Sequence, residues 1–364
     1  MSNLKKVQDF LVDRQIDAAL ITNPDNIFYL SNFRSDPHER LLGVVIFKEK
    51  EPFIICPSME VSDVKAIGWP HDVIGYKDTD NAFEFLEKAI LDRISELTLL
   101  AIEKEHLTVD RFEILQERFP ALLFAKSDDM LAKNRLIKDV REIEYLRKAA
   151  QLADYAIEVG CGEIAEGKTE LEIVQAVEQA VKQKGAEKMA FETIIISGKK
   201  TASPHGIPGD RRIEKGDFIL FDLGVVYKGY CSDITRTVSF GEPAEAKLKI
   251  YETVKKAQQA AIDTVRPGIL AKEVDLAARS IIDEAGYGEL FPHRIGHGLG
   301  ISVHEYPSIT EHNNLPLEEG MVFTIEPGIY DPEITGVRIE DDVLVTKDGV
   351  EVLTKFPKEL KIIE

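Results

Sequence analysis

The chain has 364 residues, 44% of them hydrophobic and 30% charged, which is typical of a soluble globular protein large enough for two domains. Its formal net charge of −19 argues against nucleic acid or anionic membrane as a partner, and no apolar stretch approaches the ~20 residues that span a bilayer. The N-terminus lacks a secretory pattern, and three distant cysteines form neither a disulfide framework nor a CxxC site, so we expect a cytoplasmic protein.

Residues 1–126 alternate helix and strand signals and predict a compact α/β domain. Helices are expected at Leu4–Gln15, Ala82–Leu97 and Val109–Arg118, and strands at Ala18–Thr22, Gly43–Phe47, Pro52–Cys56 and Leu99–Glu103. A turn is expected at Asn23–Asp25, and the region shows no glycine-rich phosphate loop and no metal-ligand cluster. The charged segment Lys126–Asp139 changes this rhythm, so we place a domain boundary between residues 126 and 127.

Residues 127–364 repeat one layout: helix, helix, loop, strand pair. The first copy has helices at Val140–Glu158 and Thr169–Lys184, a strand at Thr193–Ser197 and a strand pair within Asp217–Phe240. The second has helices at Ala244–Val265 and Ala271–Ala285 and a strand pair at Met321–Glu326 and Val337–Val345. Thr169 followed by Glu172 predicts a capping box at the start of the second helix. Duplicated halves commonly place a site at their interface.

The first strand pair carries an electrostatic problem. Phe218–Val226 is an apolar run interrupted by Asp222, the pattern of a strand buried on both faces. A turn over Val226–Gly229 would set Asp222 opposite Asp233, and directly opposed like charges repel. A metal ion held between the two carboxylates would resolve the repulsion. One protonated aspartate, or an aspartate that caps the turn, is the alternative.

The second strand pair poses the same problem. A loop centred on Glu333 would set Glu326 opposite Glu340, although Pro327–Gly328 can introduce a bulge. Two acidic pairs on two hairpins, in halves of similar layout, predict a common site.

Histidines lie between and before these hairpins. In FPHRIGHGLGISVHEY, residues 291–306, the glycines argue against a helix and indicate backbone packed closely beside a site. His297 would complete a mixed carboxylate and imidazole ligand set, with His293, His304 and the loop residue His205 nearby. His38, in a charged loop, is read as solvated surface or as part of a loop that reaches into a pocket across a dimer interface.

These residues resemble a known family. Asp222, Asp233, His297, Glu326 and Glu340, in that order and with GHGLG and EPG contexts, are similar to the ligands of the dinuclear metallopeptidases of the pita-bread fold. That family includes methionine aminopeptidase, aminopeptidase P and prolidase, and the resemblance covers about residues 130–364. The N-terminal region resembles the extra domain of the proline-specific branch and of creatinase. The resemblance implies an α+β protein: an N-terminal α/β creatinase-type domain and a C-terminal pita-bread metallopeptidase domain.

The resemblance also implies roles. Asp222, Asp233, His297, Glu326 and Glu340 would bind two divalent ions, with manganese favoured and cobalt or zinc as alternatives. His205 and His304 match histidines that contact the substrate and the tetrahedral intermediate. His293 and Arg338 match residues of the proline-specific members. Because Arg338 lies two residues before Glu340, both face one side of a strand, and Arg338 could hold a substrate carboxylate or form a salt bridge to a ligand carboxylate. A homodimer is also implied.

The expected reaction is hydrolysis of the Xaa-Pro bond of a short peptide by a hydroxide between two divalent ions, with Glu326 moving the proton and His304 stabilising the oxyanion. A dipeptidase is favoured because the chain is short for the family and offers several cations for a free carboxylate: His38, Arg40, His293, Arg294 and Arg338. Aminopeptidase P is the alternative, followed by methionine aminopeptidase and a scaffold that only binds.

Overall fold

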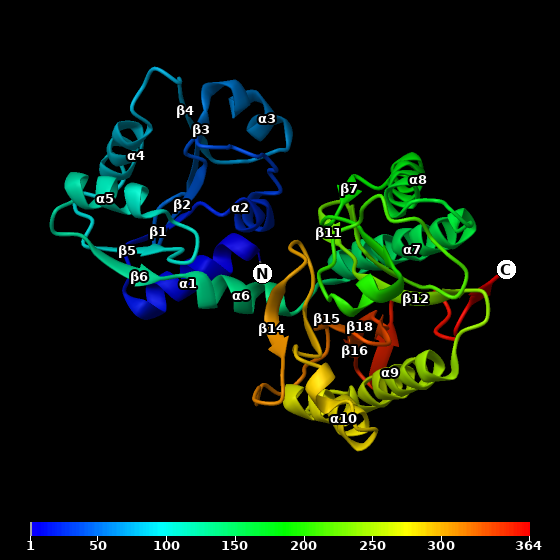
Figure 1. Cartoon of the computed structure of the whole chain (residues 1–364). Coiled ribbons are helices and arrows are strands. Elements are labelled where there is room, and N and C mark those ends of the chain that lie inside the picture. The colour runs from blue at the N-terminus through cyan, green and yellow to red at the C-terminus, as the bar shows by residue number, and fades with distance from the viewer. Residues whose placement is uncertain (1) are drawn as a thin grey trace. The chain divides into compact units, whose positions relative to one another are not determined.

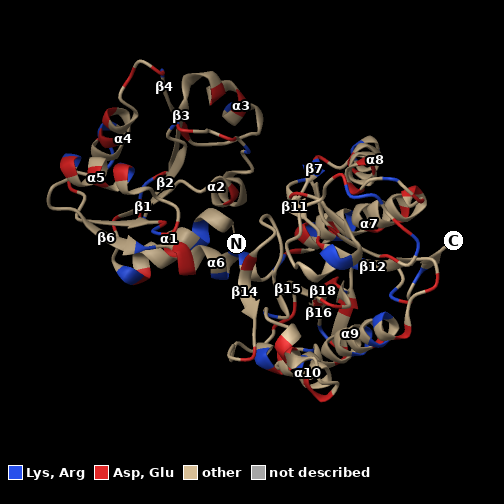
Figure 2. Cartoon of the chain, in the orientation of Figure 1, with Lys and Arg blue, Asp and Glu red and all other residues tan. Residues whose placement is uncertain are grey.

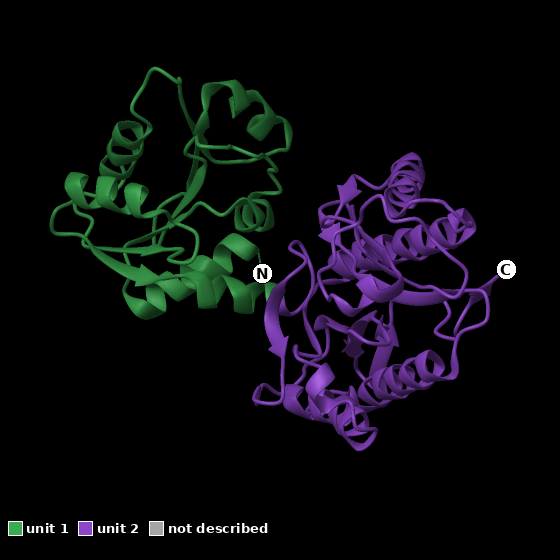
Figure 3. Ribbon diagram, viewed as in Figure 1, with its two compact units in different colours: residues 1–135 green, residues 136–364 purple. Residues whose placement is uncertain are grey.

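The computed structural model describes residues 2–364, which form two compact units that divide after Arg135 (Figure 3). The division lies nine residues beyond the boundary expected at residue 126, because the charged segment that follows folds as helix α6 (Asp128–Leu136). Among residues 2–364, no helix is both long and apolar enough to cross a membrane. Acidic residues, interspersed with basic ones, lie on helices of both units (Figure 2).

Unit 1 is built on a six-stranded mixed sheet in the order β4-β3-β2-β1-β5-β6. Its strands are β1 (Ala18–Ile21), β2 (Gly43–Phe47), β3 (Phe53–Pro57), β4 (Asp72–Tyr76), β5 (Leu99–Ile102) and β6 (Leu123–Lys126). Its helices, besides α6, are α1 (Asn3–Arg14), α2 (Pro24–Ser31), α3 (Val61–Ala66), α4 (Ala82–Leu91) and α5 (Val109–Arg118). The strands expected at Gly43–Phe47 and Pro52–Cys56 correspond to β2 and β3, which pair antiparallel as a hairpin.

Two predictions in unit 1 were wrong. The expected turn at Asn23–Asp25 is the start of α2: Asn23 Oδ1 accepts hydrogen bonds from the amides of Asp25 and Asn26, and proline is favoured in a first helical turn. Helix α4 ends at Leu91 rather than Leu97. The strands β4 and β6, which extend the sheet on either side, were not predicted from the sequence.

Unit 2 has the predicted repeated layout (Figure 1). Its helices are α7 (Val140–Glu163), α8 (Glu170–Gln183), α9 (Glu245–Thr264) and α10 (Ala271–Glu284). Its strands are β7 (Lys188–Met189), β8 (Ile194–Ser197), β9 (Phe218–Leu223), β10 (Val225–Tyr227), β11 (Tyr230–Cys231), β12 (Ile234–Phe240), β13 (Gly296–Gly298), β14 (Glu305–Ile309), β15 (Val322–Ile325), β16 (Gly328–Asp331), β17 (Thr335–Arg338), β18 (Asp341–Thr346), β19 (Gly349–Val352) and β20 (Ile362–Ile363). The capping box of Thr169 and Glu172 is confirmed.

Each helix pair of unit 2 covers its own sheet. One apolar cluster joins α7 and α8 to the sheet β20-β12-β9-β8, with Ile157 and Phe221 fully buried. A second joins α9 and α10 to the sheet β14-β13-β15-β18-β19, with Val254 and Phe323 fully buried. Two further sheets are small, β11-β10-β7 and β16-β17. The two predicted hairpins thus belong to two separately packed halves.

The register predicted for the first hairpin was wrong by two residues. Asp222 on β9 pairs with Thr235 on β12, not with Asp233. The turn between β10 and β11 is centred on Lys228 and Gly229, whose φ angles are 50° and 86°. Two successive positive φ angles are typical of a type I′ turn, whose twist matches that of a hairpin. Because this turn lies one residue later than expected, every pairing moves by two.

The register predicted for the second hairpin is confirmed. Ile325 on β15 lies opposite Asp341 on β18, and the pairing of β16 with β17 continues in the same register. Glu326 and Glu340 therefore oppose each other about Glu333, in the gap between the two paired segments. Neither residue belongs to a paired strand segment there, and both side chains point into the same region of unit 2.

Candidate metal centre

Buried side chains from separate strand ends converge in unit 2. Asp233, His297 and Glu340 each offer one ligand atom, and these atoms lie within 4.8 Å of one another. Glu326 adjoins them, because its Oε1 is 3.3 Å from His297 Nε2, while Asp233 Oδ2 is 3.8 Å from the same nitrogen. The charge of Asp222 contributes to raising the pKa of Asp233, Glu340 and Glu326, which places it beside the same cluster.

Hydrogen bonds across the two hairpins hold the acidic residues in place. The amide of Asp233 donates to Asp342 Oδ2 at 3.0 Å, and the amide of Glu340 donates to the carbonyl of Thr235 at 3.1 Å. Thr235 Oγ1 also donates to Glu340 Oε2 at 2.6 Å. The spacing between Asp233 and Glu340 is therefore set by contacts between the halves and not by either hairpin alone.

His297 is placed by close backbone packing. A Cβ atom at Gly296 would lie 1.8 Å from the carbonyl oxygen of Thr324, so β13 can approach β15 only with glycine at that position. The amide of His297 donates to Thr324 Oγ1 at 3.1 Å, and this hydroxyl donates to Glu326 Oε1 at 3.3 Å. The close backbone packing expected from the glycines around His297 is confirmed.

The electrostatics of the cluster follow from burial. Burial, reinforced by neighbouring carboxylates, raises the pKa of Asp233 and of Glu340 well above the ordinary range. Burial raises the pKa of Glu326 to about 7. Burial and the nearby His304 lower the pKa of His297 to about 3, so its imidazole is neutral at physiological pH. The cluster thus combines mutually repelling carboxylates with one neutral nitrogen donor.

This donor set fits a divalent cation. Asp233 Oδ1 is buried and has no hydrogen-bond partner among residues 2–364. An unpaired buried carboxylate oxygen is costly, and a cation bound there would remove the cost. Carboxylate oxygens with one imidazole nitrogen suit manganese, cobalt or zinc. Asp233, His297, Glu326 and Glu340 are the residues that would hold such an ion, with Asp222 alongside.

Arg338 is engaged through all three of its side-chain nitrogens. Nη2 contacts the Asp222 carboxylate, Nη1 donates to the Tyr330 hydroxyl at 2.8 Å and to the Pro204 carbonyl at 3.4 Å, and Nε donates to Thr235 Oγ1 at 3.1 Å. Only 4% of Arg338 is exposed. Of the two roles left open by the sequence, the salt bridge to a predicted ligand carboxylate is the one present.

A chain of hydrogen bonds continues from Arg338 to His293. His293 Nε2 lies 2.9 Å from the Tyr330 hydroxyl, and Nδ1 lies 2.7 Å from the carbonyl of Arg294, which requires a proton on Nδ1. Burial lowers the pKa of His293 to about 4, so the ring is neutral and Nε2 accepts from Tyr330. Tyr330 covers Gly328, where a Cβ atom would lie 2.4 Å from the tyrosine hydroxyl oxygen.

The other histidines differ in placement. The ring of His304 packs edge-on against that of His297, with centroids 4.1 Å apart, and His304 is exposed on its other side. His205 is exposed, and it follows Pro204, whose carbonyl accepts a hydrogen bond from Arg338 Nη1 at 3.4 Å, so its backbone lies near Arg338. His38 belongs to unit 1, where it is exposed with a φ of 53°.

Comparison with known proteins agrees with this arrangement. Residues 144–347 match metallopeptidase family M24, and residues 3–137 match the creatinase/prolidase N-terminal domain. This chain belongs to metallopeptidase family M24. The expected pita-bread unit and creatinase-type unit are therefore confirmed, and the buried carboxylate and imidazole cluster lies in the M24 unit.

Relatives of this M24 protein match it over 96% to 100% of its length. It is 48% identical over 363 residues to a Bacillus subtilis (strain 168) protein named "Putative dipeptidase YkvY", with 100% of both chains covered. A prolidase of Pyrococcus horikoshii OT3 has 41% identity and a TM-score of 0.91, covering 98% of this chain and 99% of its own. An Xaa-Pro dipeptidase of Bacillus anthracis has 35% identity and a TM-score of 0.92, covering 99% of both chains. An X-Pro aminopeptidase of Thermotoga maritima MSB8 has 34% identity and a TM-score of 0.86, covering 96% of this chain and 99% of its own.

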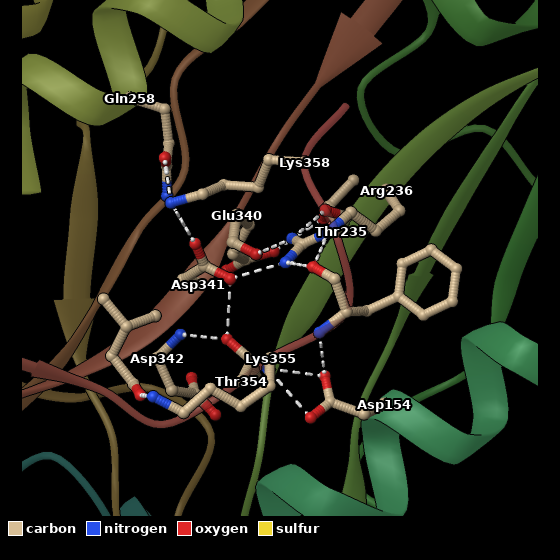
Figure 4. Close-up of polar contacts among 12 residues, drawn as sticks. Asp154, Thr235, Arg236, Gln258, Glu340, Asp341, Asp342, Thr354, Lys355 and Lys358 are labelled. Atoms are coloured by element: carbon tan, nitrogen blue, oxygen red, sulfur yellow. Dashed lines mark hydrogen bonds and ion pairs between the residues drawn. The ribbon is translucent and has the colours of Figure 1, made fainter. Parts of the chain in front are cut away.

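A buried polar network centred on Arg236 adjoins the M24 cluster at Glu340 (Figure 4). Its guanidinium donates to Asp341 Oδ1 at 2.7 Å, to the carbonyl of Phe356 at 2.6 Å and to the carbonyl of Glu340. Arg236 is 1% exposed and lies three residues after Asp233. It therefore links the strand that follows Asp233, the backbone of Glu340 and the C-terminal segment.

Four residues of this site were missed from the sequence: Thr235, Arg236, Thr324 and Tyr330. Thr235 follows Asp233 by two positions and Thr324 precedes Glu326 by two, so strand alternation places each on the same side as its acidic neighbour. Applying that alternation to every predicted ligand would have found both. Arg236 was visible as a lone cation in a strand of apolar and hydroxyl residues. Nothing local distinguishes Tyr330 from a core tyrosine.

Proposed function

We propose that this M24 metallopeptidase is an Xaa-Pro dipeptidase that hydrolyses the bond before proline in dipeptides and uses two divalent metal ions. The observation that carries the proposal is the buried convergence of Asp233, His297 and Glu340 beside Glu326, with an orphaned oxygen on Asp233. Support for the substrate class comes from the solved relatives named prolidase and Xaa-Pro dipeptidase.

In this proposal the five ligands are Asp222, Asp233, His297, Glu326 and Glu340, and manganese is the favoured metal, with cobalt or zinc as alternatives. Bound divalent ions would polarise the scissile carbonyl and lower the pKa of a water molecule. The chain itself contributes a site that excludes bulk water, because every ligand that could hold the metal is largely buried. A low-polarity surrounding strengthens each electrostatic contact made there.

The protein groups around the cluster have distinct proposed tasks. Glu326, whose Oε1 lies 3.3 Å from His297 Nε2 in the cluster, can take a proton from the attacking water and pass it to the leaving proline nitrogen. His304, neutral and partly exposed, can donate its ring N–H to the carbonyl oxygen as that atom gains charge. His205 and His293 would contact the substrate. Arg338 would hold the Asp222 carboxylate in place.

Specificity for a dipeptide requires a cation for the free carboxylate close to the scissile bond. Arg338 is engaged with Asp222, Tyr330 and Thr235, so we assign this task to Arg294. Arg294 Nη1 donates to Ser308 Oγ at 3.2 Å, and the charge of Arg294 contributes to lowering the pKa of both Glu326 and His304. A guanidinium near both residues could pair with the carboxylate of a prolyl residue.

A peptide panel tests the proposal. The protein, stripped of metal and supplied with Mn, Co or Zn in turn, should hydrolyse Ala-Pro with at least one metal. It should leave Ala-Pro-Ala and Met-Ala-Ser largely uncleaved. The control is Asp233→Ala, which should be inactive with every metal. Preferential cleavage of Ala-Pro-Ala would establish the aminopeptidase P alternative instead, and cleavage of Met-Ala-Ser a methionine aminopeptidase. Inactivity of the metal-loaded protein towards all three peptides would support the alternative that the protein is a scaffold that only binds.

We also propose that the protein is a cytoplasmic homodimer acting on small peptides, without nucleic-acid or membrane partners. The dimer is what the resemblance to the proline-specific branch implies, and the net charge of −19 supports the absence of polyanionic partners. Light scattering coupled to gel filtration would give twice the chain mass of 40.8 kDa for a dimer. A mass of one chain across the working concentration range would refute it.

A further inference from the structure

Glu170, the first residue of α8, is a fully buried carboxylate outside the metal cluster. Its Oε1 accepts hydrogen bonds from Ser197 N at 2.8 Å and Ser197 Oγ at 2.9 Å. Its Oε2 accepts from Lys200 Nζ at 2.7 Å and Gly209 N at 2.9 Å. One side chain therefore binds the first residue, the last residue and one interior residue of the segment 197–209, which carries His205.

These contacts are not needed to begin α8. The N-terminus of that helix is already satisfied by Thr169, whose hydroxyl accepts from the Glu172 amide while the Glu172 carboxylate accepts from the Thr169 amide. Burying an ionised carboxylate costs several kcal/mol unless donors compensate it. All four donors that compensate Glu170 come from residues 197–209, so its burial is linked to the shape of that segment.

The same segment, residues 197–209, also contacts strand β17. Thr201 Oγ1 accepts from the Gly336 amide at 2.9 Å, and a Cβ atom at Gly336 would lie 1.9 Å from the Thr201 carbonyl oxygen. The carbonyl of Pro204, next to His205, accepts from Arg338 Nη1 at 3.4 Å. His205 therefore lies in the loop that follows the 3₁₀ helix η2 (Gly198–Ala202), and residues 198–209 are held between Glu170 and the strand carrying Arg338.

We propose that Glu170 is a positioning residue that fixes His205 at the substrate site. The proposal rests on the proposed function, in which His205 contacts the substrate. Glu170 touches neither substrate nor metal ligands in this arrangement, so it acts through the loop. Its loss would release His205 while leaving the metal cluster intact, because residues 198–209 contribute no ligand to that cluster.

Kinetics of Glu170→Gln, His205→Ala and the double variant on Ala-Pro test this coupling. The glutamine amide presents a donor where Lys200 and Gly209 need an acceptor, so we expect kcat/KM to fall by about 10-fold or more, with bound metal unchanged by elemental analysis. The double variant should be no worse than His205→Ala alone. Multiplicative losses, or an unchanged kcat/KM in Glu170→Gln, would overturn the proposal. The control is Glu172→Gln, which preserves the capping box and should keep wild-type kinetics.

Hydrogen exchange provides a readout that does not depend on activity. In Glu170→Gln, amides of residues 198–209 should exchange faster by about 10-fold, while those of residues 217–240 stay as in the wild type. Unchanged exchange in residues 198–209 would overturn the proposal even if no peptide were cleaved. If Glu170→Gln fails to fold, Lys200→Met provides a milder variant that removes one of the four donors to Glu170. We expect it to show the same changes in exchange and kinetics, but smaller ones. Wild-type exchange and kinetics in Lys200→Met would refute the coupling.

Discussion

At the scale of single residues, Asp233 combines strong burial with an oxygen that has no partner among residues 2–364. Burial and Glu340 raise its pKa, which means that its charge destabilises the metal-free fold. We predict that Asp233→Asn raises the free energy of unfolding of the metal-free protein by on the order of 1 kcal/mol, while abolishing metal binding. Urea unfolding in the presence of a chelator and metal titration measure the two effects.

The control for this prediction is Asp341→Asn, the same substitution at a buried neighbour. Asp341 is paired with Arg236 at 2.7 Å, and despite the opposing effect of burial, Arg236 and Lys358 lower its pKa. Its charge therefore stabilises the fold, and its replacement should lower the free energy of unfolding. If both variants moved stability in the same direction, the electrostatic account of Asp233 would be contradicted.

The pKa of Glu326 predicts how the metal-free protein responds to pH. Burial raises this pKa to about 7 in the folded chain, above the ordinary value of 4.5. Between these two values the folded state binds a proton that the unfolded state does not, so stability should rise as pH falls from about 7 towards 4.5. Urea unfolding of the chelated protein between these limits measures the slope, which Glu326→Gln should reduce. A slope of the opposite sign that Glu326→Gln leaves unchanged would contradict this assignment.

At the scale of elements, β13 depends on the absence of a side chain at Gly296. An alanine there would place its Cβ 1.8 Å from the Thr324 carbonyl oxygen and force β13 away from β15, carrying His297 with it. We predict that Gly296→Ala lowers the free energy of unfolding by about 1–3 kcal/mol and lowers peptidase activity by about 100-fold.

The matched control is Gly162→Ala in α7, where nothing lies within 4 Å of the added atom. Alanine is favoured over glycine in a helix by up to about 1 kcal/mol, so this variant should be neutral or slightly more stable and fully active. Thermal unfolding and Ala-Pro hydrolysis compare the two. Equal stability and equal activity of the two alanine variants would show that β13 can shift to accommodate the added methyl group, which would contradict the prediction.

At the scale of the whole M24 unit, the two halves meet through buried polar contacts. Arg236, on β12 of the first half, binds the Asp341 carboxylate and the Glu340 carbonyl of the second half (Figure 4). Removing one member of a buried ion pair leaves the other unpaired, so Arg236→Met should lower the free energy of unfolding by about 3 kcal/mol or more. It should also weaken metal binding, because Asp233 and Glu340 would lose their fixed spacing.

An exposed ion pair between the same halves provides the comparison. Arg147 on α7 binds Glu351 on β19 at 2.6 Å, with 44% and 32% of the two side chains exposed. Arg147→Ala should change stability by less than about 1 kcal/mol and leave metal affinity unaltered, because solvent screens the pair. Urea unfolding and metal titration of both arginine variants would measure the contrast. A loss for Arg236→Met as small as that for Arg147→Ala would contradict a role for Arg236 in joining the halves.

Local sequence determined much of this protein. Apolar periodicity and the capping pair Thr169 and Glu172 predicted the long helices of the M24 unit, and the symmetry about Glu333 predicted the facing of Glu326 and Glu340. These features depend on contacts between residues near in sequence, which is why they can be read without a structure. The glycines around His297 also allowed close backbone packing to be predicted, because only a residue without a Cβ atom permits such an approach.

Tertiary structure decided the rest. The type I′ turn at Lys228 and Gly229 removed the direct opposition of Asp222 and Asp233, since turn geometry depends on backbone angles that composition specifies poorly. The salt bridge of Arg338 with Asp222 joins residues 116 positions apart, and Glu170 reaches its loop only because α8 packs beside it. Sequence alone thus determined which acidic and imidazole groups the chain supplies. The packing of the two halves decided their spacing, because the contacts that set it join residues more than 100 positions apart.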